Sequence, residues 1–191
     1  MDPNTAHANE DLWVFAYGSL MWRPDFPFIE RIEARLLGAH RALCVLSFVH
    51  RGTPERPGLV LGLDRGGACR GIAYRVSVRE RAATVAYLRK REQVTSVYRE
   101  VVRPVWLQRH PEQQRVPALC YMVDRGHPQY AGRLSLERQL HHVRQGHGLS
   151  GANRDYVTAT VAALEQLGYR ETQLHLLAQL IAGGGTLIRH R

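Results

Sequence analysis

The chain has little cysteine, and what it has is scattered. Cys44, Cys69 and Cys120 are odd in number and stand in none of the spacings that hold a metal or carry out dithiol redox chemistry. A disulfide-stapled scaffold and a cysteine-based metal site are therefore excluded. We expect three free thiols in a reducing compartment.

Long apolar runs are also missing. The longest, near residues 43–49 and 174–181, are far too short to cross a bilayer. Residues 1–11 are polar and acidic, unlike the basic and then apolar start of a secretory signal. We therefore expect a cytoplasmic protein without membrane contact. Its 191 residues suffice for one cored domain over 1–191, with 1–11 and 183–191 as flexible tails.

Lysine is nearly absent, since Lys90 is the only one among 26 basic residues. The net charge is nevertheless +9, almost all of it from arginines spread along the chain, many of them beside Glu or Asp. No basic run is interleaved with stacking aromatics, and no nucleic-acid-binding signature is present. We expect no nucleic-acid partner, and a positive field that attracts a small anionic substrate.

Strand patterns come first in the chain and helix patterns last. Strands are expected at 13–17, in two segments of 30–49 divided near Gly38, and at 59–63, 71–76, 97–107 and 116–123. Helices are expected from a capping box at Ser77–Glu80 to about Glu92, from Ser135 to Gly146, from Ser150 or Asn153 to Gly168, and over 171–181. This order predicts an α+β domain with a small curved or barrel-like mixed β-sheet flanked by helices.

The first strand stops abruptly at a glycine and a serine. The apolar run Trp13–Tyr17 is followed by Gly18 and Ser19. A buried strand that breaks into such a turn directs successive backbone N–H groups into one small space, which can bind a carboxylate or a developing oxyanion. An ordinary turn at a strand end is the alternative interpretation.

Two other kinds of site are disfavoured by spacing. Ser19 lacks the Gly-x-Ser-x-Gly elbow of a serine hydrolase, because Tyr17 and Met21 stand where the glycines belong. A histidine metal site is equally poorly supported. His141 and His142 are adjacent and so face apart on a helix, while His147 follows a glycine.

Glu92 ends a predicted helix directly after three basic residues, Arg89, Lys90 and Arg91. Taken alone, such a glutamate is usually a salt-bridged surface residue. Its significance comes from the sequence blocks that precede and follow it.

Five blocks occur in the order found in one known family. They are Phe15–Phe26, His50–Thr53 followed by Pro57-Gly58, Tyr87-Leu88 with Arg91-Glu92, Tyr130–Gly132, and Gly148–Tyr156. Together they resemble the ChaC-like γ-glutamylcyclotransferases, which act on glutathione. Each block is weak by itself, but the match extends from about residue 13 to residue 180.

The resemblance implies a γ-glutamylcyclotransferase-like fold and assigns roles to residues. Glu92 would be the general base, and the backbone of Ala16, Tyr17, Gly18, Ser19, Leu20 and Met21 would bind substrate. Tyr98 and Tyr130 would contact substrate through their hydroxyls, although each is equally consistent with a core tyrosine. Arg51 would either meet a substrate carboxylate or hold its own loop, and His50 is ambiguous in the same way. The resemblance implies no metal or organic cofactor, and we expect a monomer or weak homodimer.

Three positions depart from the family pattern. Ala16 stands where glycine is frequent, and Asp155 where glutamate is common. Ser96-Val97 replaces a Gly-Gly pair before Tyr98, which puts the width of the neighbouring loop in doubt.

The implied reaction is cleavage of glutathione to 5-oxoproline and cysteinylglycine, by attack of the substrate's own α-amine on its γ-carbonyl. Because the attack is intramolecular, the enzyme mainly orients the substrate and moves a proton. Two alternatives stay open: a cyclotransferase for other γ-glutamyl amides, and a non-catalytic γ-glutamyl-binding regulatory protein.

Overall fold

The computed structural model describes residues 10–92, 95–108 and 114–183. Its contacts divide the chain into two compact units, residues 1–42 with 62–127 and residues 43–61 with 128–191. Most of the two predicted flexible tails, 1–11 and 183–191, falls outside the described residues.

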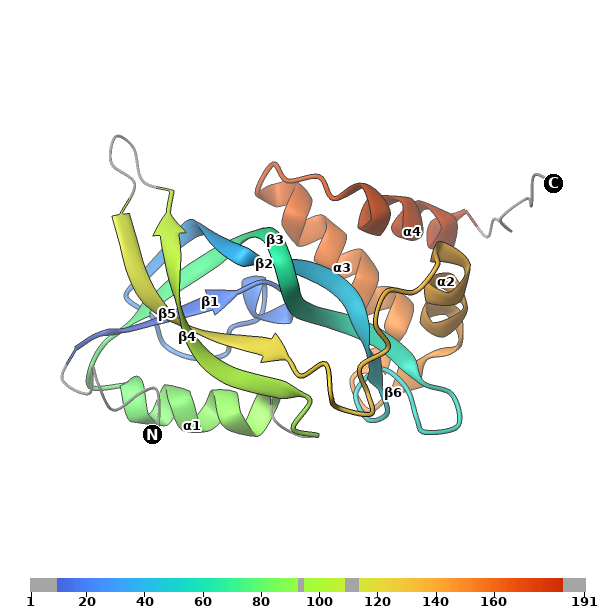
Figure 1. Cartoon of the computed structure of the whole chain (residues 1–191), viewed down its shortest axis with the longest axis horizontal. Helices are drawn as coiled ribbons and strands as arrows, with labels where there is room; N and C mark the ends of the chain where they lie inside the picture. Colours follow the sequence, from blue (N-terminus) through green and yellow to red (C-terminus); the bar gives the residue numbers. More distant parts are fainter. Residues whose placement is uncertain (1–9, 93–94, 109–113, 184–191) are drawn as a thin grey trace. The chain divides into compact units, whose positions relative to one another are not determined.

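Five strands of the chain form a closed barrel, most of whose residues belong to the first unit (Figure 1). Its strands are β1 (Leu12–Ala16), β2 (Glu30–Ser47), β3 (Gly58–Val76), β4 (Tyr98–Leu107) and β5 (Gln114–Val123). They are bonded in the order β1-β3-β2-β4-β5, and β3 also pairs with β5. Strand β1 runs antiparallel to β3 and parallel to β5. The predicted barrel-like mixed sheet is thus confirmed.

Two of the barrel strands are longer than the sequence pattern predicts. Gly38 lies inside β2 with a φ of +80°, where we expected the strand to divide. Likewise β3 runs unbroken through Gly66 and Gly67, whose φ angles are +95° and +70°. Glycines let a strand bend sharply without ending, so they mark bends in the barrel instead of separate strands.

Helix α1 (Arg81–Glu92) follows β3 and carries Glu92 at its last position. It begins later than the predicted capping box, because the Ser77 hydroxyl accepts a bond from the N–H of Arg79 and residues 77–80 form a separate turn. Arg89 bonds to Glu100 of β4, so the helix lies beside that strand (Figure 1). This contact sets the end of α1 against the barrel.

The second unit contains three helices in mutual contact, α2 (Leu136–Gln145), α3 (Asn153–Gln166) and α4 (Thr172–Ala182) (Figure 1). Ser135 caps α2 as predicted, accepting a bond from the N–H of Arg138 at 3.3 Å. Neither Ser150 nor Asn153 caps α3; the Asn153 amide instead bonds to both the N–H and the carbonyl of Leu59. The short strands β6 (His147–Gly148) and β7 (Gly151–Ala152) had no sequence signal.

The three cysteines are free and buried, as predicted. In the described part of the chain, no three His, Cys, Asp or Glu side chains gather as a metal site would require. None of the helices in the same residues is both long and apolar enough to cross a membrane.

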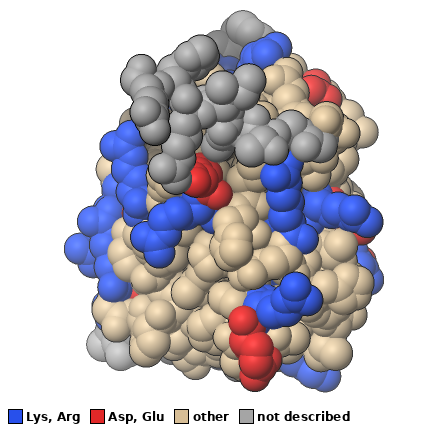
Figure 2. All heavy atoms as spheres, turned by 90° about the vertical axis from the view of Figure 1, so that its right-hand side faces the viewer, with Lys and Arg blue, Asp and Glu red and all other residues tan. Residues whose placement is uncertain are grey.

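Positive charge is spread out instead of gathered. Figure 2 shows Lys and Arg side chains as separate groups over one face, with Asp or Glu among them. Several arginines are paired with carboxylates, including Arg99 with Asp124 at 2.7 Å and Arg125 with Asp64 at 2.6 Å. On this face the basic side chains of the described residues therefore form no continuous stripe.

Gly71 allows β3 to approach the end of β1. A Cβ atom at this position would lie 2.2 Å from the carbonyl oxygen of Ala16 and 3.0 Å from the ring of Phe15. The first contact is with backbone, so no side-chain rotation can relieve it. Glycine is needed here to place the residues that follow Ala16.

Gly71→Ala should therefore lower the free energy of unfolding by about 1–3 kcal/mol, the usual cost of overpacking. Gly126→Ala is the matched control, because its Cβ would meet no atom closer than the Asp124 carboxylate at 3.5 Å. Urea unfolding of both variants measures the difference. Equal stability of the two variants would contradict the close approach.

Candidate active site

The turn after β1 is a single 3₁₀ turn over Ser19–Met21, preceded by Gly18. The N–H of Met21 donates to Gly18 O at 2.9 Å, and the N–H groups of Trp22 and Arg23 donate to Ser19 O. The N–H groups of residues 18–20 come before these donors, and a helical turn has no internal acceptors for its first N–H groups. The binding of an anion by these N–H groups stays a prediction.

Buried side chains hold the carbonyl oxygens of the turn. The Arg41 guanidinium donates to Tyr17 O and, at 2.6 Å, to Arg70 O on β3. The Tyr74 hydroxyl lies 3.1 Å from both Leu20 O and Met21 O. With its carbonyls fixed in this way, the turn has a defined orientation on the barrel.

An aromatic cluster connects the turn to α1. Phe26 packs edge-on against Tyr74, with ring centroids 5.5 Å apart, and against Tyr87 of α1 at 6.3 Å. Asp25, just before it, has a φ of 56° and reverses the chain direction. The segment after the turn is therefore packed between the barrel and the helix.

Arg91 contacts more groups of this region than any residue that the sequence singled out. Its Nη2 donates to Ser19 Oγ at 3.0 Å. Its Nη1 donates to Tyr87 OH at 2.6 Å and Arg23 O at 2.8 Å, and reaches Asp25 at 3.3 Å. Its Nε lies 3.5 Å from the Glu92 carboxylate. The structure thus brings Glu92 beside the turn.

Burial changes the acidity of Glu92. Its side chain is only 16% exposed, and its pKa is raised from 4.5 to about 7. Loss of solvation is the main cause, and the nearby Arg91 charge lowers the pKa in part. A carboxyl group with this pKa both accepts and releases a proton near neutral pH, as general acid–base chemistry requires.

A second carboxylate near this helix is committed to structural bonds. Glu100 of β4, 8% exposed, accepts two bonds from Arg89, at 3.0 and 2.7 Å, and one from Tyr121 OH at 3.0 Å. Burial, Glu100 and Glu92 together raise the pKa of Tyr121. No pattern in the sequence indicated this network. Its members Arg89, Glu100 and Tyr121 lie on a helix and two strands, and only the folded structure brings them together.

The two predicted substrate tyrosines belong to different units. Tyr98 begins β4, is half-buried and pairs with Val123 in the barrel. Tyr130 lies in the second unit, where it forms a bridge with Val45. Their contacts with substrate stay predictions.

Arg51 holds its own loop in the second unit. Its Nη1 donates to Ala152 O at 3.1 Å, and its guanidinium lies 5.5 Å from the centre of the Tyr156 ring. His50, next to it, is 3.0 Å from Ser150 Oγ. The sequence left two roles open for Arg51, contact with a substrate carboxylate or a structural role. These contacts favour the structural role.

The Ser96-Val97 departure has a structural consequence. Ser96 has a φ of +58°, a left-handed conformation that glycine adopts without strain. Val97 is buried, and its carbonyl accepts a bond from the N–H of Asp124 at 2.8 Å. The chain thus keeps a glycine-like backbone here while it adds a buried side chain.

Ser96→Gly should raise the free energy of unfolding by about 1 kcal/mol, because it removes the left-handed strain of a residue with a Cβ. Ser96→Ala is the control, because it keeps a Cβ atom at the same positive φ and should therefore gain no stability. Thermal unfolding compares the two. A loss of stability in Ser96→Gly would contradict the claim that the backbone of Ser96 is strained.

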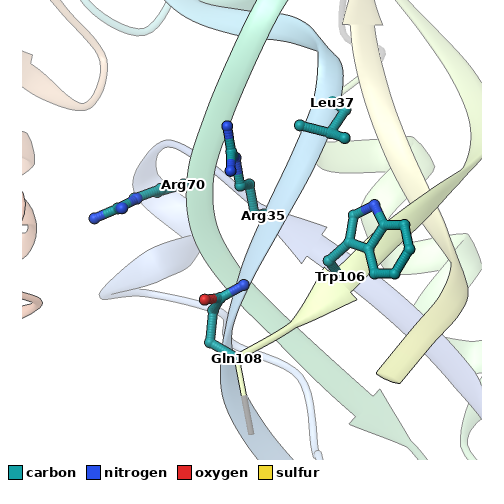
Figure 3. A pocket seen from close by; sticks show the side chains of 5 residues that line it. All are labelled: Arg35, Leu37, Arg70, Trp106 and Gln108. Carbon is teal, nitrogen blue, oxygen red and sulfur yellow. The ribbon is translucent and has the colours of Figure 1, made fainter. Parts of the chain in front are cut away.

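A surface hollow of about 270 Å³ lies elsewhere on the barrel (Figure 3). Its lining comes from β2, β3, β4 and the residue after β4: Arg35, Leu37, Arg70, Trp106 and Gln108. None of the predicted site residues is among them. The residues predicted to form the site therefore lie outside this hollow.

The raised pKa of Glu92 has a measurable effect on stability. Between pH 4.5 and about 7 the folded protein binds more protons at Glu92 than the unfolded chain does, so stability is lost as pH rises through this window. Glu92→Gln should therefore be more stable than the wild type above pH 7, by up to the order of 3 kcal/mol. Below pH 4.5 the gain should vanish.

Chemical denaturation from pH 4 to pH 9 measures this gain. Glu80→Gln removes an exposed carboxylate from the turn before the same helix, and should leave the pH dependence as in the wild type. A Glu92→Gln gain that does not change with pH would contradict the raised pKa.

Comparison with known proteins places the chain in a family. The sequence model of the family described as ChaC-like protein matches residues 12–183. A glutathione-specific γ-glutamylcyclotransferase of Escherichia coli K12 is 33% identical over 165 residues, which cover 86% of this chain and 70% of that protein. Glutathione-specific γ-glutamylcyclotransferase 1 of Homo sapiens is 30% identical over 179 residues, covering 93% and 80%.

Solved structures agree at the level of the fold. The crystal structure of a γ-glutamylcyclotransferase specific to glutathione from yeast superposes with a TM-score of 0.84. The match covers 95% of this chain and all of that one, at 20% sequence identity. The predicted fold is thereby confirmed. From the family match over residues 12–183 and these relatives, the chain belongs to the ChaC-like family of γ-glutamylcyclotransferases.

Proposed function

We propose that this protein is a glutathione-specific γ-glutamylcyclotransferase with Glu92 as its general base. The observation that carries the proposal is a carboxyl group with a pKa of about 7, held beside the turn after β1, in a member of this enzyme family. The relatives from E. coli and human are named for the same activity. The names of these relatives support glutathione as the substrate, and the position and pKa of Glu92 support its role as the base.

The reaction needs one base that works twice. The α-amino group of the γ-glutamyl unit arrives protonated, and Glu92 accepts its proton. The free amine attacks the γ-carbonyl carbon, a C–N bond forms and the carbonyl oxygen takes the negative charge. When that oxyanion collapses, the original amide C–N bond breaks and the leaving nitrogen takes the proton from Glu92. Glu92 then accepts the second proton of the attacking nitrogen, which leaves the neutral lactam N–H, and passes it to the released amine or to water. The products are 5-oxoproline and cysteinylglycine.

The turn after β1 serves the anionic parts of the substrate. Backbone N–H groups of Gly18, Ser19 and Leu20 would donate to the α-carboxylate or to the oxyanion. Such donors cost no reorganisation during the reaction, because buried bonds to Arg41 and Tyr74 already hold the carbonyls of the same turn. The substrate supplies its own nucleophile, so orientation accounts for much of the rate.

The proposal predicts release of 5-oxoproline when purified protein is incubated with glutathione. Glu92→Gln should lower kcat by about 100-fold or more, because an amide cannot accept the proton. In the wild type, kcat/KM should rise with pH through about 7, because it follows the free enzyme, in which Glu92 becomes the unprotonated base at that pKa. A chromatographic assay for 5-oxoproline measures both.

A matched control is Glu80→Gln, which removes an exposed carboxylate near the start of the same helix and should keep wild-type turnover. Full activity in Glu92→Gln would refute the catalytic assignment. A panel of other γ-glutamyl amides tests the specificity, and faster turnover of one of them would replace glutathione as the substrate. Tight glutathione binding without 5-oxoproline would instead indicate a regulatory protein.

A further inference from the structure

We propose that Arg91 is the positioning residue of this site: one guanidinium sets the distance between Glu92 and the turn after β1. The inference rests on the proposed function, because it assigns a role within that reaction. The sequence places Arg91 in a basic helix end and in the Arg91-Glu92 block of the family resemblance, with no role of its own. Its contacts give it a separate role.

The nitrogens of Arg91 contact both the helix end and the turn. Nε lies 3.5 Å from the Glu92 carboxylate, an ion-pair distance. Nη2, which shares an edge of the guanidinium with Nε, donates to Ser19 Oγ at 3.0 Å, and Nη1 donates to Arg23 O at 2.8 Å. Because a guanidinium is planar and rigid, the groups that contact its three nitrogens are held at a fixed separation.

The Arg91 side chain is itself held in place. It is 20% exposed, and its Nη1 donates to Tyr87 OH, one helical turn earlier, at 2.6 Å. The carboxylate of Asp25 lies 3.3 Å from the same nitrogen. A side chain with this many partners has little freedom to reorient, so it can transmit the position of the turn to the helix end.

Arg91 also acts on Glu92 through its charge. The positive charge lowers the pKa that burial raises, and so keeps more of the carboxyl group in its basic form at neutral pH. Charged groups around this helix end include Asp25, which is paired with Arg23 at 3.0 Å, the Arg89–Glu100 pair of α1 and β4, and the Tyr121 hydroxyl of β5. Arg91 is the charge that lowers the pKa of Glu92, so its removal should leave more of the rise that burial causes.

Two substitutions separate the role of geometry from the role of charge. Arg91→Lys keeps the positive charge but has a single ammonium group in place of the planar fork. It should lower kcat by about 100-fold, the cost of a misplaced catalytic group, while the pH profile stays near that of the wild type. Arg91→Met loses both, so its kcat should fall at least as far and its pH profile should move to higher pH.

Ser19→Ala and Lys90→Met complete the experiment. Ser19→Ala removes the hydroxyl that accepts a bond from Arg91 Nη2 and does not change the charge. It should lower kcat by about tenfold with an unchanged pH profile. Lys90→Met removes a positive charge from the adjacent, exposed position of the same helix. It should keep wild-type kcat and pH profile, which shows that general loss of charge is not the cause.

The measurements are kcat, KM and the pH profile with glutathione, together with thermal unfolding of each variant. Wild-type kcat in both Arg91→Lys and Ser19→Ala would overturn the positioning role. A wild-type pH profile in Arg91→Met would overturn the charge role. Ser19→Ala keeps the test decisive if the Arg91 variants do not fold.

A titration independent of turnover distinguishes this inference from the proposed function. The carboxyl carbon of Glu92, observed by NMR in protein labelled with ¹³C-glutamate, reports its pKa without substrate. We expect a higher pKa in Arg91→Met than in wild type and Lys90→Met. If the wild type released no 5-oxoproline, the proposed function would fail, while an unchanged pKa in Arg91→Met would refute the charge role of Arg91.

Discussion

The site depends on bonds between side chains and the carbonyl oxygens of one short turn. Arg41 holds Tyr17 O, Tyr74 holds Leu20 O and Met21 O, and Arg91 holds Arg23 O. A turn has as many N–H groups as carbonyls, and once its carbonyls are bonded to the barrel and to α1 its first N–H groups keep a fixed direction. The barrel, the aromatic cluster and α1 all contribute to this fixation.

The same arrangement places Glu92 where a carboxylate is poorly solvated. Its raised pKa costs folding stability at neutral pH, and the protein offsets only part of that cost with the charge of Arg91. A surface glutamate with an ordinary pKa would not lower the free energy of unfolding at neutral pH, but it would be a weaker base near pH 7. The cost is therefore consistent with a group kept for chemistry, as strained or destabilised groups at functional sites commonly are.

The sequence predicted the elements better than it predicted what connects them. The strand that stops at Gly18, the cap at Ser135 and the strands after α1 follow from local patterns that the structure retains. Each of the long strands β2 and β3 was predicted as two separate strands, because glycines such as Gly38 and Gly66 are typical of strand ends. In the barrel these glycines lie inside continuous strands. Glu92 was found through family resemblance. Arg91 stands in the same sequence block but was given no role, and Arg41 was missed, because most of their partners are distant in sequence.

The central claim is that the turn after β1 and Glu92 face a single ligand. A crystal structure with 5-oxoproline bound tests this most directly, since the product retains the carboxylate, the carbonyl oxygen and the nitrogen of the reacting unit. We predict one oxygen of the ligand within hydrogen-bond distance of the N–H groups of Gly18–Leu20, with the Glu92 carboxylate within the same reach of the ring nitrogen. A ligand found instead in the hollow lined by Arg35 and Trp106, or bound to the turn with Glu92 directed away, would contradict the account.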